Sequence, residues 1–391
     1  MKPARRMVSA SAILLVLTIS ACTSESAEET AEPRESSSDP SVQGPGLLHL
    51  SDAELSRAPD SVLQVVGRKR AKVAESTEML PYSLTPDGLI VAGIKRRDPQ
   101  NPLRLVRNDL ALVHPRSGQV NYLSTRAQSE GVQVTAAATT RRWVTWITTP
   151  STSMASNPWT LYSYDRKNDT VRKLADAPTF PNGNAPMTSD FSYPSIVAGR
   201  VYLTGASSDQ SGGTAATSVY SAALDGRGEL REDFRREEHP IAAGKTIVTV
   251  PTTDEKSAQI VMHYANRPGK SEVIAEGRIE DVAHSTNGTA WTQKQRGKHV
   301  VMLKTETGDA RAVFEARRAV KDLLLTEKYI QFEIGNAVYW YDLDSESLSE
   351  LDERGVYLPP NGHGNYVVWK TDSPHLIKPG GKIVVARLDP E

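Results

Sequence analysis

Few side chains in this sequence have the types and spacing needed for covalent chemistry. The chain has one cysteine, Cys22, and eight histidines. It contains no nucleophile elbow, no paired zinc-binding histidines of a protease and no glycine-rich loop for phosphates or dinucleotides. One cysteine cannot form an internal disulfide or a cysteine-based metal site. The sequence therefore predicts neither a cofactor nor a metal site, and it favours a binding protein over an enzyme.

Two groups of residues are the remaining metal-ligand candidates. Four histidines fall within two successive repeats, at different positions along their strands: His239, His263, His284 and His299. The acidic run at residues 342–346 has calcium-loop chemistry but lacks the glycine and downstream glutamate of such a loop. Asp and Ser are also ordinary turn residues. We interpret both groups as structural, with a metal site as the alternative.

Cys22 directly follows a segment typical of an export signal. Basic residues at the N-terminus precede an apolar run at residues 10–19, and small residues stand before the cysteine. The apolar run is shorter than the roughly 20 residues that a membrane-spanning helix needs. Residues 19–22, Ile-Ser-Ala-Cys, resemble the lipobox of bacterial lipoproteins.

The lipobox resemblance implies that residues 1–21 are a signal peptide and that Cys22 carries lipid after cleavage. Two or more acyl chains hold a protein firmly on a membrane surface. The expected location is therefore the cell membrane, where the protein is lipid-anchored on the extracytoplasmic side. The alternative is an ordinary signal peptide in which the cysteine is coincidental.

Residues 22–60 are predicted to be the lipidated cysteine and a flexible acidic tether. Between residues 23 and 46 there are six acids, one arginine and almost no large apolar side chains. Such a segment cannot bury enough surface to order itself. A short apolar patch at residues 47–50, followed by residues 52–55, is expected to dock as a helical turn.

The charge of the chain argues against nucleic acid as a partner. The whole sequence has 46 basic and 47 acidic residues, and without the first 21 residues 43 basic residues remain against 47 acidic ones. A nucleic-acid-binding protein normally carries an excess of basic residues.

Residues 61–391 have the repeating pattern of an all-β propeller, which is clearest at residues 319–353. Residues 320–325 form a buried-looking strand, and residues 330–334 alternate apolar and polar side chains. Gly335-Asn336 is a two-residue hairpin turn that leads to two further short strands. Four short antiparallel strands joined by tight turns describe one propeller blade.

This unit occurs seven times, which predicts a seven-bladed β-propeller of four-stranded antiparallel blades. Turn glycines recur in phase from Gly88 to Gly364, at an average spacing of 46 residues, which is typical of propeller blades. The seventh repeat stops one strand short, at residues 382–388. Residues 62–66 form an unassigned apolar strand, and we expect this strand to complete the last blade and close the ring.

Two repeats carry a more specific signature. Residues 83–92, Ser-Leu-Thr-Pro-Asp-Gly followed by Leu-Ile-Val-Ala, resemble the repeat of TolB-like bacterial propellers, and residues 286–291 are a looser copy. The resemblance implies an extracytoplasmic protein-binding propeller and brings no catalytic residues with it.

The predicted binding site lies on the long loops of blades seven, one, two and three, which open on the same face of the ring. Arginine and aromatic side chains are the usual anchors of an interface, and function commonly sits on loops. Loops also accept extra residues at little cost, so tolerated insertions are the alternative. The candidate residues are Arg96, Arg97, Arg104, Arg107, Trp159, Phe180, Met187, Phe191, Lys370, His375 and Lys378.

These observations predict a membrane-anchored propeller that binds a protein or an anionic envelope polymer. One alternative is a propeller enzyme, a lyase or hydrolase, that acts on an envelope glycan with two converging carboxylates. Another is an accessory lipoprotein of a signalling or secretion complex.

Overall fold

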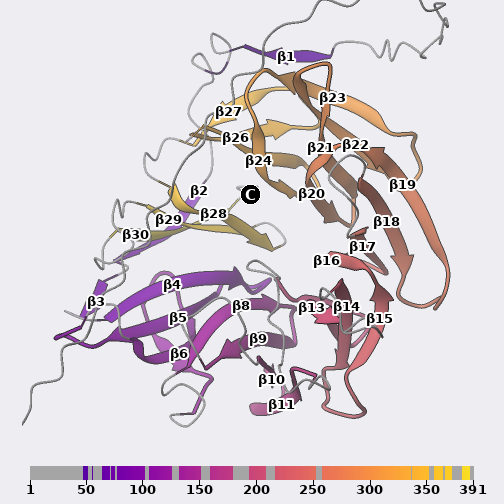
Figure 1. Cartoon of the computed structure of the whole chain (residues 1–391). Helices are drawn as coiled ribbons and strands as arrows, with labels where there is room; N and C mark the ends of the chain where they lie inside the picture. Colours follow the sequence, from indigo (N-terminus) through magenta and orange to yellow (C-terminus); the bar gives the residue numbers. More distant parts are fainter. Residues whose placement is uncertain are drawn as a thin grey trace, which may run out of the picture. The chain divides into compact units, whose positions relative to one another are not determined.

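The computed structural model describes residues 47–387, with gaps at 52–54, 56–63, 71, 75–76, 102–104, 126–131, 151–158, 179–192, 208–215, 252–257, 336, 352–355, 364–365 and 372–380. The predicted signal peptide, Cys22 and most of the predicted tether lie outside the described residues. The described part is all-β and consists of seven antiparallel sheets, which follow one another in sequence order around a ring (Figure 1).

Each sheet is one blade, and its strands follow the chain from the centre of the ring outward. Blade one contains β4 (Thr77–Leu84), β5 (Ile90–Arg97), β6 (Leu105–Val113) and β7 (Val120–Tyr122). Blade two contains β8 (Gln133–Thr139), β9 (Trp143–Thr149), β10 (Thr160–Asp165) and β11 (Thr170–Asp176). Blade three contains β12 (Ser195–Val197), β13 (Arg200–Ser207), β14 (Ala216–Ala223) and β15 (Arg231–Arg235). Blade four contains β16 (Glu237–Ala243), β17 (Thr246–Pro251), β18 (Ala258–Tyr264) and β19 (Ser271–Gly277).

The remaining three blades follow the same order, except that the outer strand of blade seven comes from the N-terminal side of the chain. Blade five contains β20 (Ile279–Ser285), β21 (Gly288–Gln295), β22 (Lys298–Thr305) and β23 (Arg311–Ala316). Blade six contains β24 (Val320–Leu325), β25 (Tyr329–Ile334), β26 (Ala337–Asp342) and β27 (Leu348–Glu350). Blade seven contains β28 (Val356–His363), β29 (Tyr366–Thr371), β30 (Lys382–Arg387) and β2 (Gln64–Arg70). The predicted fold, a seven-bladed propeller of four-stranded blades, is confirmed.

The ring is closed by β2, which comes from the N-terminal side of the chain. This strand pairs antiparallel with β30, and the register runs from Gln64 opposite Arg387 to Arg70 opposite Lys382. The predicted closing strand is therefore confirmed for residues 64–66. The strand extends four residues further than predicted, and residues 62 and 63 lie outside the described part. Closure gives both ends of the sheet ring a hydrogen-bonded partner.

Two short strands lie outside the four-stranded pattern. β3 (Lys72–Ala74) pairs with the start of β4. β1 (Leu48–Leu50) pairs in parallel with β23, the outer strand of blade five. The prediction that residues 22–60 form a flexible tether is thus wrong for residues 48–50, because apolar Leu50 is buried against blade five and the backbone pairs with its edge. The apolar patch thus forms a strand and not the expected helical turn, and of residues 52–55 only Leu55 is described, whose N–H donates to the Ser51 carbonyl at 3.0 Å.

The inner strands are irregular, and neighbouring blades bond to these irregular positions. β-Bulges interrupt β4, β8, β16, β20, β24 and β28. In blade four the His239 N–H donates to Thr204 Oγ1 of blade three at 2.9 Å. In blade six the Leu323 N–H donates to Asp281 Oδ2 of blade five at 2.9 Å. Side chains of one blade thereby satisfy backbone groups that a bulge leaves unpaired in the next.

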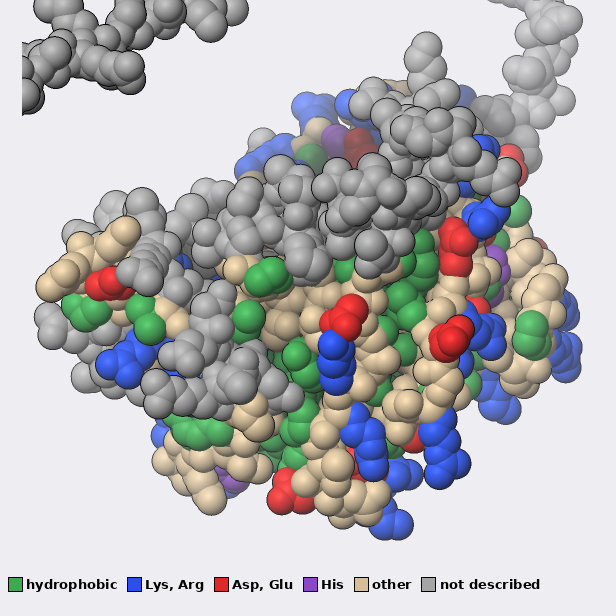
Figure 2. Space-filling model, turned by 60° about the horizontal axis from the view of Figure 1, so that its bottom comes forward, with side chains coloured by type: hydrophobic (Ala, Val, Ile, Leu, Met, Phe, Trp, Pro, Cys, Tyr) green, Lys and Arg blue, Asp and Glu red, His purple; other side chains and the backbone are tan. Residues whose placement is uncertain are grey.

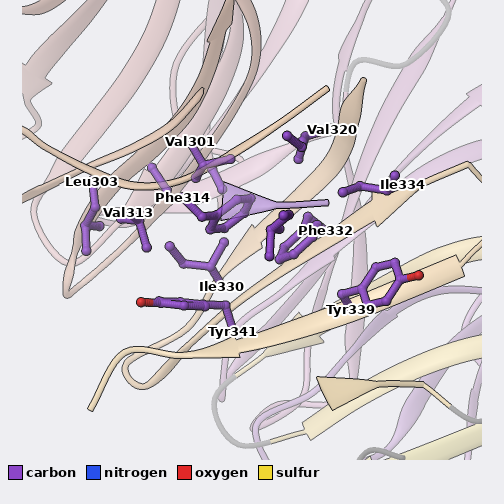
Figure 3. Packing of buried hydrophobic residues seen from close by; sticks show 14 of the residues in the cluster. Val301, Leu303, Val313, Phe314, Val320, Ile330, Phe332, Ile334, Tyr339 and Tyr341 are labelled. Atoms are coloured by element: carbon purple, nitrogen blue, oxygen red, sulfur yellow. The ribbon is translucent and has the colours of Figure 1, made fainter. Parts of the chain in front are cut away.

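The core consists of apolar clusters between adjacent blades. Blades five and six share the largest of these, in which Phe314 lies against Phe332 with ring centroids 4.5 Å apart (Figure 3). Four tryptophans on the strands are almost fully buried, at Trp146, Trp291, Trp340 and Trp369. Trp143 is half-buried and lies under the Arg142 guanidinium.

Candidate binding surfaces

Three arginines of the predicted site lie at the long-loop end of blade one. Arg96 on β5 is directly opposite Arg107 on β6, and Arg97 is the last residue of β5. Arg107 Nε lies 2.6 Å from Asp109 Oδ2, whereas the Arg96 side chain is exposed and forms no ion pair with another described residue. The structure therefore places Arg96 and Arg107 opposite each other on paired strands rather than in the predicted loop, and their role in binding stays a prediction.

Trp159 does not belong to this surface, so its assignment as a binding residue is wrong. Its side chain is only 1% exposed and packs with Leu161 and Leu203 between blades two and three. Its carbonyl accepts a hydrogen bond from the Ala177 N–H at 2.8 Å, which extends the pairing of β10 with β11. In the sequence, a large aromatic residue directly after a long loop is typical of a binding anchor, but here the blades bury its side chain.

The other predicted binding residues are not tested. Arg104, Phe180, Met187, Phe191, His375 and Lys378 lie outside the described residues. Lys370 lies on β29, where only its backbone is described. Their role in binding stays a prediction.

The opposite face, which we call the turn face, is described almost completely. It consists of the first-to-second turns of the seven blades and the third-to-fourth turns of blades one to six, because antiparallel strands place these turns at the same end. The turn between β4 and β5 needs Gly88, whose φ of 78° falls in the left-handed region that favours glycine. Outside the described part of this face are the first turn of blade seven, residues 364–365, and the residues that precede β2 and follow β30, 61–63 and 388–391.

Charge is unevenly distributed over the turn face. We call the turns of blades one to four the basic half. Its cationic residues are Arg116, Arg141, Arg142, Arg166, Lys167, Arg227, Lys245, Arg267 and Lys270, and its acids are Asp87, Asp169, Asp225 and Glu229. The turns of blades five and six form the acidic half. Its acids are Glu306, Asp309, Glu327, Asp344 and Glu346, and its one cationic residue is Lys328. Lys and Arg side chains also gather along the lower margin of the molecule in Figure 2.

Two ion pairs organise the turns of blades one and two. Arg142 Nη2 lies 2.7 Å from Asp165 Oδ2 within blade two. Arg166 Nη1 and Nη2 donate to the two oxygens of Asp87, at 2.9 and 2.8 Å, and so connect blade two to blade one. Both are fork-like arginine–carboxylate pairs, which hold the guanidinium planes in a fixed orientation.

The arginines lower the pKa of both carboxyl groups. The hydrogen bond from Arg142 lowers the pKa of Asp165 to about 2, although burial opposes the shift. The hydrogen bond from Arg166 likewise lowers the pKa of Asp87 to about 2. Both carboxylates therefore stay ionised at any pH above about 3, and the two arginines stay paired.

These turns surround a shallow pocket of about 490 Å³. Its lining comes from three turns and consists of Pro86, Asp87, Arg141, Arg142, Arg166 and Lys167. Arg141 and Lys167 are exposed, and their side chains form no ion pair with any residue that the structure describes. The sequence reasoning missed this pocket because it followed loop length. The available signal was the two basic pairs, Arg141-Arg142 and Arg166-Lys167, in the two turns of one blade.

A group of carboxylates lies between blades five and six. Burial raises the pKa of Asp281 to about 6, and the nearby charge of Asp322 adds to the shift. Burial and Asp322 also raise the pKa of Glu333. Asp281 Oδ1 accepts a hydrogen bond from the Val282 N–H at 2.8 Å, and Oδ2 accepts one from the Leu323 N–H. Both oxygens of this carboxyl group therefore bind backbone N–H groups rather than a ligand.

The histidines considered as ligands bond to nearby protein groups. His263 Nε2 lies 2.6 Å from Glu237 Oε2 and stacks on Phe234. His284 bonds to Thr246 across the boundary of blades four and five, and burial lowers its pKa to about 4. His299 pairs with Glu280. Among the described residues, no group of three or more His, Cys, Asp or Glu side chains is placed to hold a metal ion. Within the same ranges, no helix is long and apolar enough to cross a membrane.

Comparison with known proteins shows the fold. No protein-family model and no curated protein matches the sequence. The structure is similar to acylaminoacyl peptidase of Pyrococcus horikoshii, at 10% identity and a TM-score of 0.55, over 82% of this chain and 54% of that one. This chain thus spans about half the length of that peptidase.

Two further solved structures match over most of their own length. The propeller domain of the trilobed protease from Pyrococcus furiosus, which has an open velcro topology, matches at 10% identity and a TM-score of 0.55 over 82% of this chain and 97% of that one. The uncharacterized protein lmo1340 of Listeria monocytogenes matches at 9% identity and a TM-score of 0.51 over 78% and 92%. The chain is therefore a seven-bladed propeller similar to the propeller domains of such peptidases.

Proposed function

We propose that this chain is a lipoprotein of the cell membrane, anchored through Cys22 on the extracytoplasmic side, whose propeller binds a protein or an anionic envelope polymer. A β-propeller suits a scaffold or binding module because its loops and turns are displayed on a rigid ring. The lipobox-like residues 19–22 support the anchor, and the resemblance of residues 83–92 to TolB-like propellers supports an extracytoplasmic binding role.

The proposal of an anionic partner rests on one observation, which is that Arg96 lies directly opposite Arg107 at the long-loop end of blade one. Like charges directly opposite each other on neighbouring strands destabilise a sheet. Asp109 neutralises Arg107 in part, but the exposed Arg96 has no such partner among the described residues. An anion bound between the two guanidinium groups would remove the repulsion.

The anchor is tested by Cys22→Ala in a bacterial host. We expect the variant to move from the membrane fraction to the soluble fraction or the medium, because the acyl chains are its only proposed hold on the membrane. Retention of the variant in the membrane after a carbonate wash would show that the lipoprotein assignment is wrong.

The binding surface is tested by Arg96→Glu/Arg107→Glu. We expect crosslinking and pull-down from envelope extracts to lose partners with this variant. A matched control is Arg227→Glu on the turn face, where the Arg227 side chain is 90% exposed. Binding should also weaken as salt rises, since exposed charges are screened over roughly 10 Å at 0.1 M. Loss of the same partners in the control alone would contradict the assignment.

A second candidate is an enzyme-related role on an envelope glycan. The structural similarity to the propellers of peptidases supports the enzyme-related part of this proposal, and the glycan as its substrate stays a prediction. Glu333, whose pKa is raised by burial and by Asp322, is a described carboxyl group that could act as an acid. Release of reducing ends from purified envelope glycan by the wild type, and its loss in Glu333→Gln, would support this role over simple binding.

A further inference from the structure

We propose that the pocket between the turns of blades one and two is a binding site for phosphate groups. The inference goes beyond the proposed function, because it depends on the turn face alone and needs neither the Cys22 anchor nor the Arg96–Arg107 pair. The ligand class is a phosphorylated small molecule or the phosphate group of a larger envelope component.

The pocket has the size and the donors that a phosphate group requires. Its volume of about 490 Å³ exceeds that of one phosphate and leaves room for part of the group that bears it. Arginine forks and lysine ammonium groups are the side chains that proteins use for phosphate, through charge-assisted hydrogen bonds. Here four such cations, from two turns of one blade, line one concavity.

The net charge of the pocket is positive even after the internal ion pairs are counted. Four cationic groups stand against the two carboxylates of Asp87 and Asp165, which leaves a charge of +2. A phosphate monoester carries a charge of about −1.5 to −2 at pH 7. The ligand and the pocket therefore match in charge, and the match holds over a wide pH range because both carboxylates stay ionised.

The pocket is organised before any ligand arrives. Arg142 and Arg166 are fixed by their carboxylates, and Arg166 Nη1 also donates to the Arg141 carbonyl at 3.0 Å. Asp165 further accepts from the Lys167 N–H at 3.1 Å, which fixes the turn that carries Lys167. A preorganised site loses less conformational entropy when a ligand binds. The Arg141 and Lys167 side chains, which form no ion pair with a described residue, can therefore contact a ligand from turns that are already fixed.

The charge distribution of the turn face favours a small anion over an extended acidic surface. A flat acidic protein or an anionic membrane that covered the whole face would meet the acidic half, with Glu327, Asp344 and Glu346 exposed on it. Like charges across an interface cost free energy and suppress such partners. A phosphate group in the pocket would contact the basic half alone.

The test is titration calorimetry of the full chain with inorganic phosphate, glycerol 3-phosphate as a monoester and glycerophosphoglycerol as a diester. We expect the monoester to bind, and Arg141→Ser/Lys167→Ser to weaken its binding by about tenfold or more, since two charge-assisted contacts are lost. Asp87→Asn should strengthen binding severalfold, because the carboxylate that competes for Arg166 becomes neutral. A merely structural role for these residues would not produce this gain.

The matched control is Arg227→Ser/Lys270→Ser, which removes two cations of the same half outside the pocket and should leave binding within about twofold. Binding of the diester as tightly as the monoester would assign the site to a phosphodiester polymer and still support the proposal. No binding of any of the three probes, equal losses in the pocket and control variants, or equal affinity for sulfate would overturn it.

Discussion

The boundary between blades one and two and the boundary between blades five and six are held together by different forces. At the first, the Arg166–Asp87 ion pair joins the blades at the turn face, beside the Arg142–Asp165 pair. At the second, Phe314 packs against Phe332 and Tyr341, and one buried carboxyl group, Asp281, holds the backbone of the next blade.

The two boundaries therefore respond to pH in opposite directions. The folded pKa of Asp87, which joins blade one to Arg166 of blade two, is lower than its unfolded value of 3.8, so its contribution to stability is present above pH 4 and is lost as pH falls toward 2. The folded pKa of Asp281 is higher than its unfolded value, so its contribution is present below pH 4 and is lost as pH rises through about 6. Apolar packing lets blades five and six tolerate a costly buried carboxylate at their boundary. Blades one and two instead use charge, and the same charge leaves a cationic pocket.

Removal of the aromatic packing should have the largest effect. Phe314→Ala is expected to lower the free energy of unfolding by about 3–5 kcal/mol, because a fully buried ring leaves a cavity between blades five and six. Urea denaturation measures this loss. Tyr122→Ala is the control, since Tyr122 is 54% exposed on blade one and should cost less than about 0.5 kcal/mol. Equal losses would mean that aromatic packing does not distinguish the two regions.

The buried carboxyl group gives the next largest effect. Relative to Asp281→Asn, the wild type should lose up to about 3 kcal/mol of stability between pH 4 and pH 7, because ionisation of Asp281 is unfavourable only in the folded state. Thermal unfolding of both proteins at several pH values gives the difference. A difference that is independent of pH would show that Asp281 titrates normally.

The ion pair of blade two should have the opposite pH profile. Asp165→Asn is expected to cost about 2 kcal/mol at pH 7, because Arg142 loses its charged partner and the Asp165 side chain is only 1% exposed. The cost should shrink as pH falls from 4 to 2, where the wild-type carboxyl group also becomes neutral. If the difference in unfolding free energy between wild type and variant were as large at pH 2 as at pH 7, this assignment would be contradicted.

The fold could be predicted from the sequence because its signal repeats. Alternating apolar residues and in-phase turn glycines such as Gly88 and Gly288 recur in successive blades, and the missing outer strand of blade seven pointed to residues 62–66.

The candidate site was predicted less well. Loop length gave no information on burial at Trp159, and the raised pKa of Asp281 is caused first by burial between the blades and then by the charge of Asp322 on another blade. Such properties arise from contacts between blades, which no local pattern records.

Neutralisation of the acidic half should have the smallest effect and would sharpen the comparison of the two regions. Glu327→Gln/Asp344→Asn removes two exposed acids from the turns of blade six. We expect glycerol 3-phosphate affinity to rise less than about twofold at 0.15 M salt, because the Debye length there is about 8 Å and other blades lie between these turns and the pocket. At 0.01 M salt the Debye length is about 30 Å, so the rise should be larger. Calorimetry at the two salt concentrations measures both values. A tenfold rise at 0.15 M would mean that the acidic half lies close to the bound anion, and the division of the turn face into two independent halves would then be wrong.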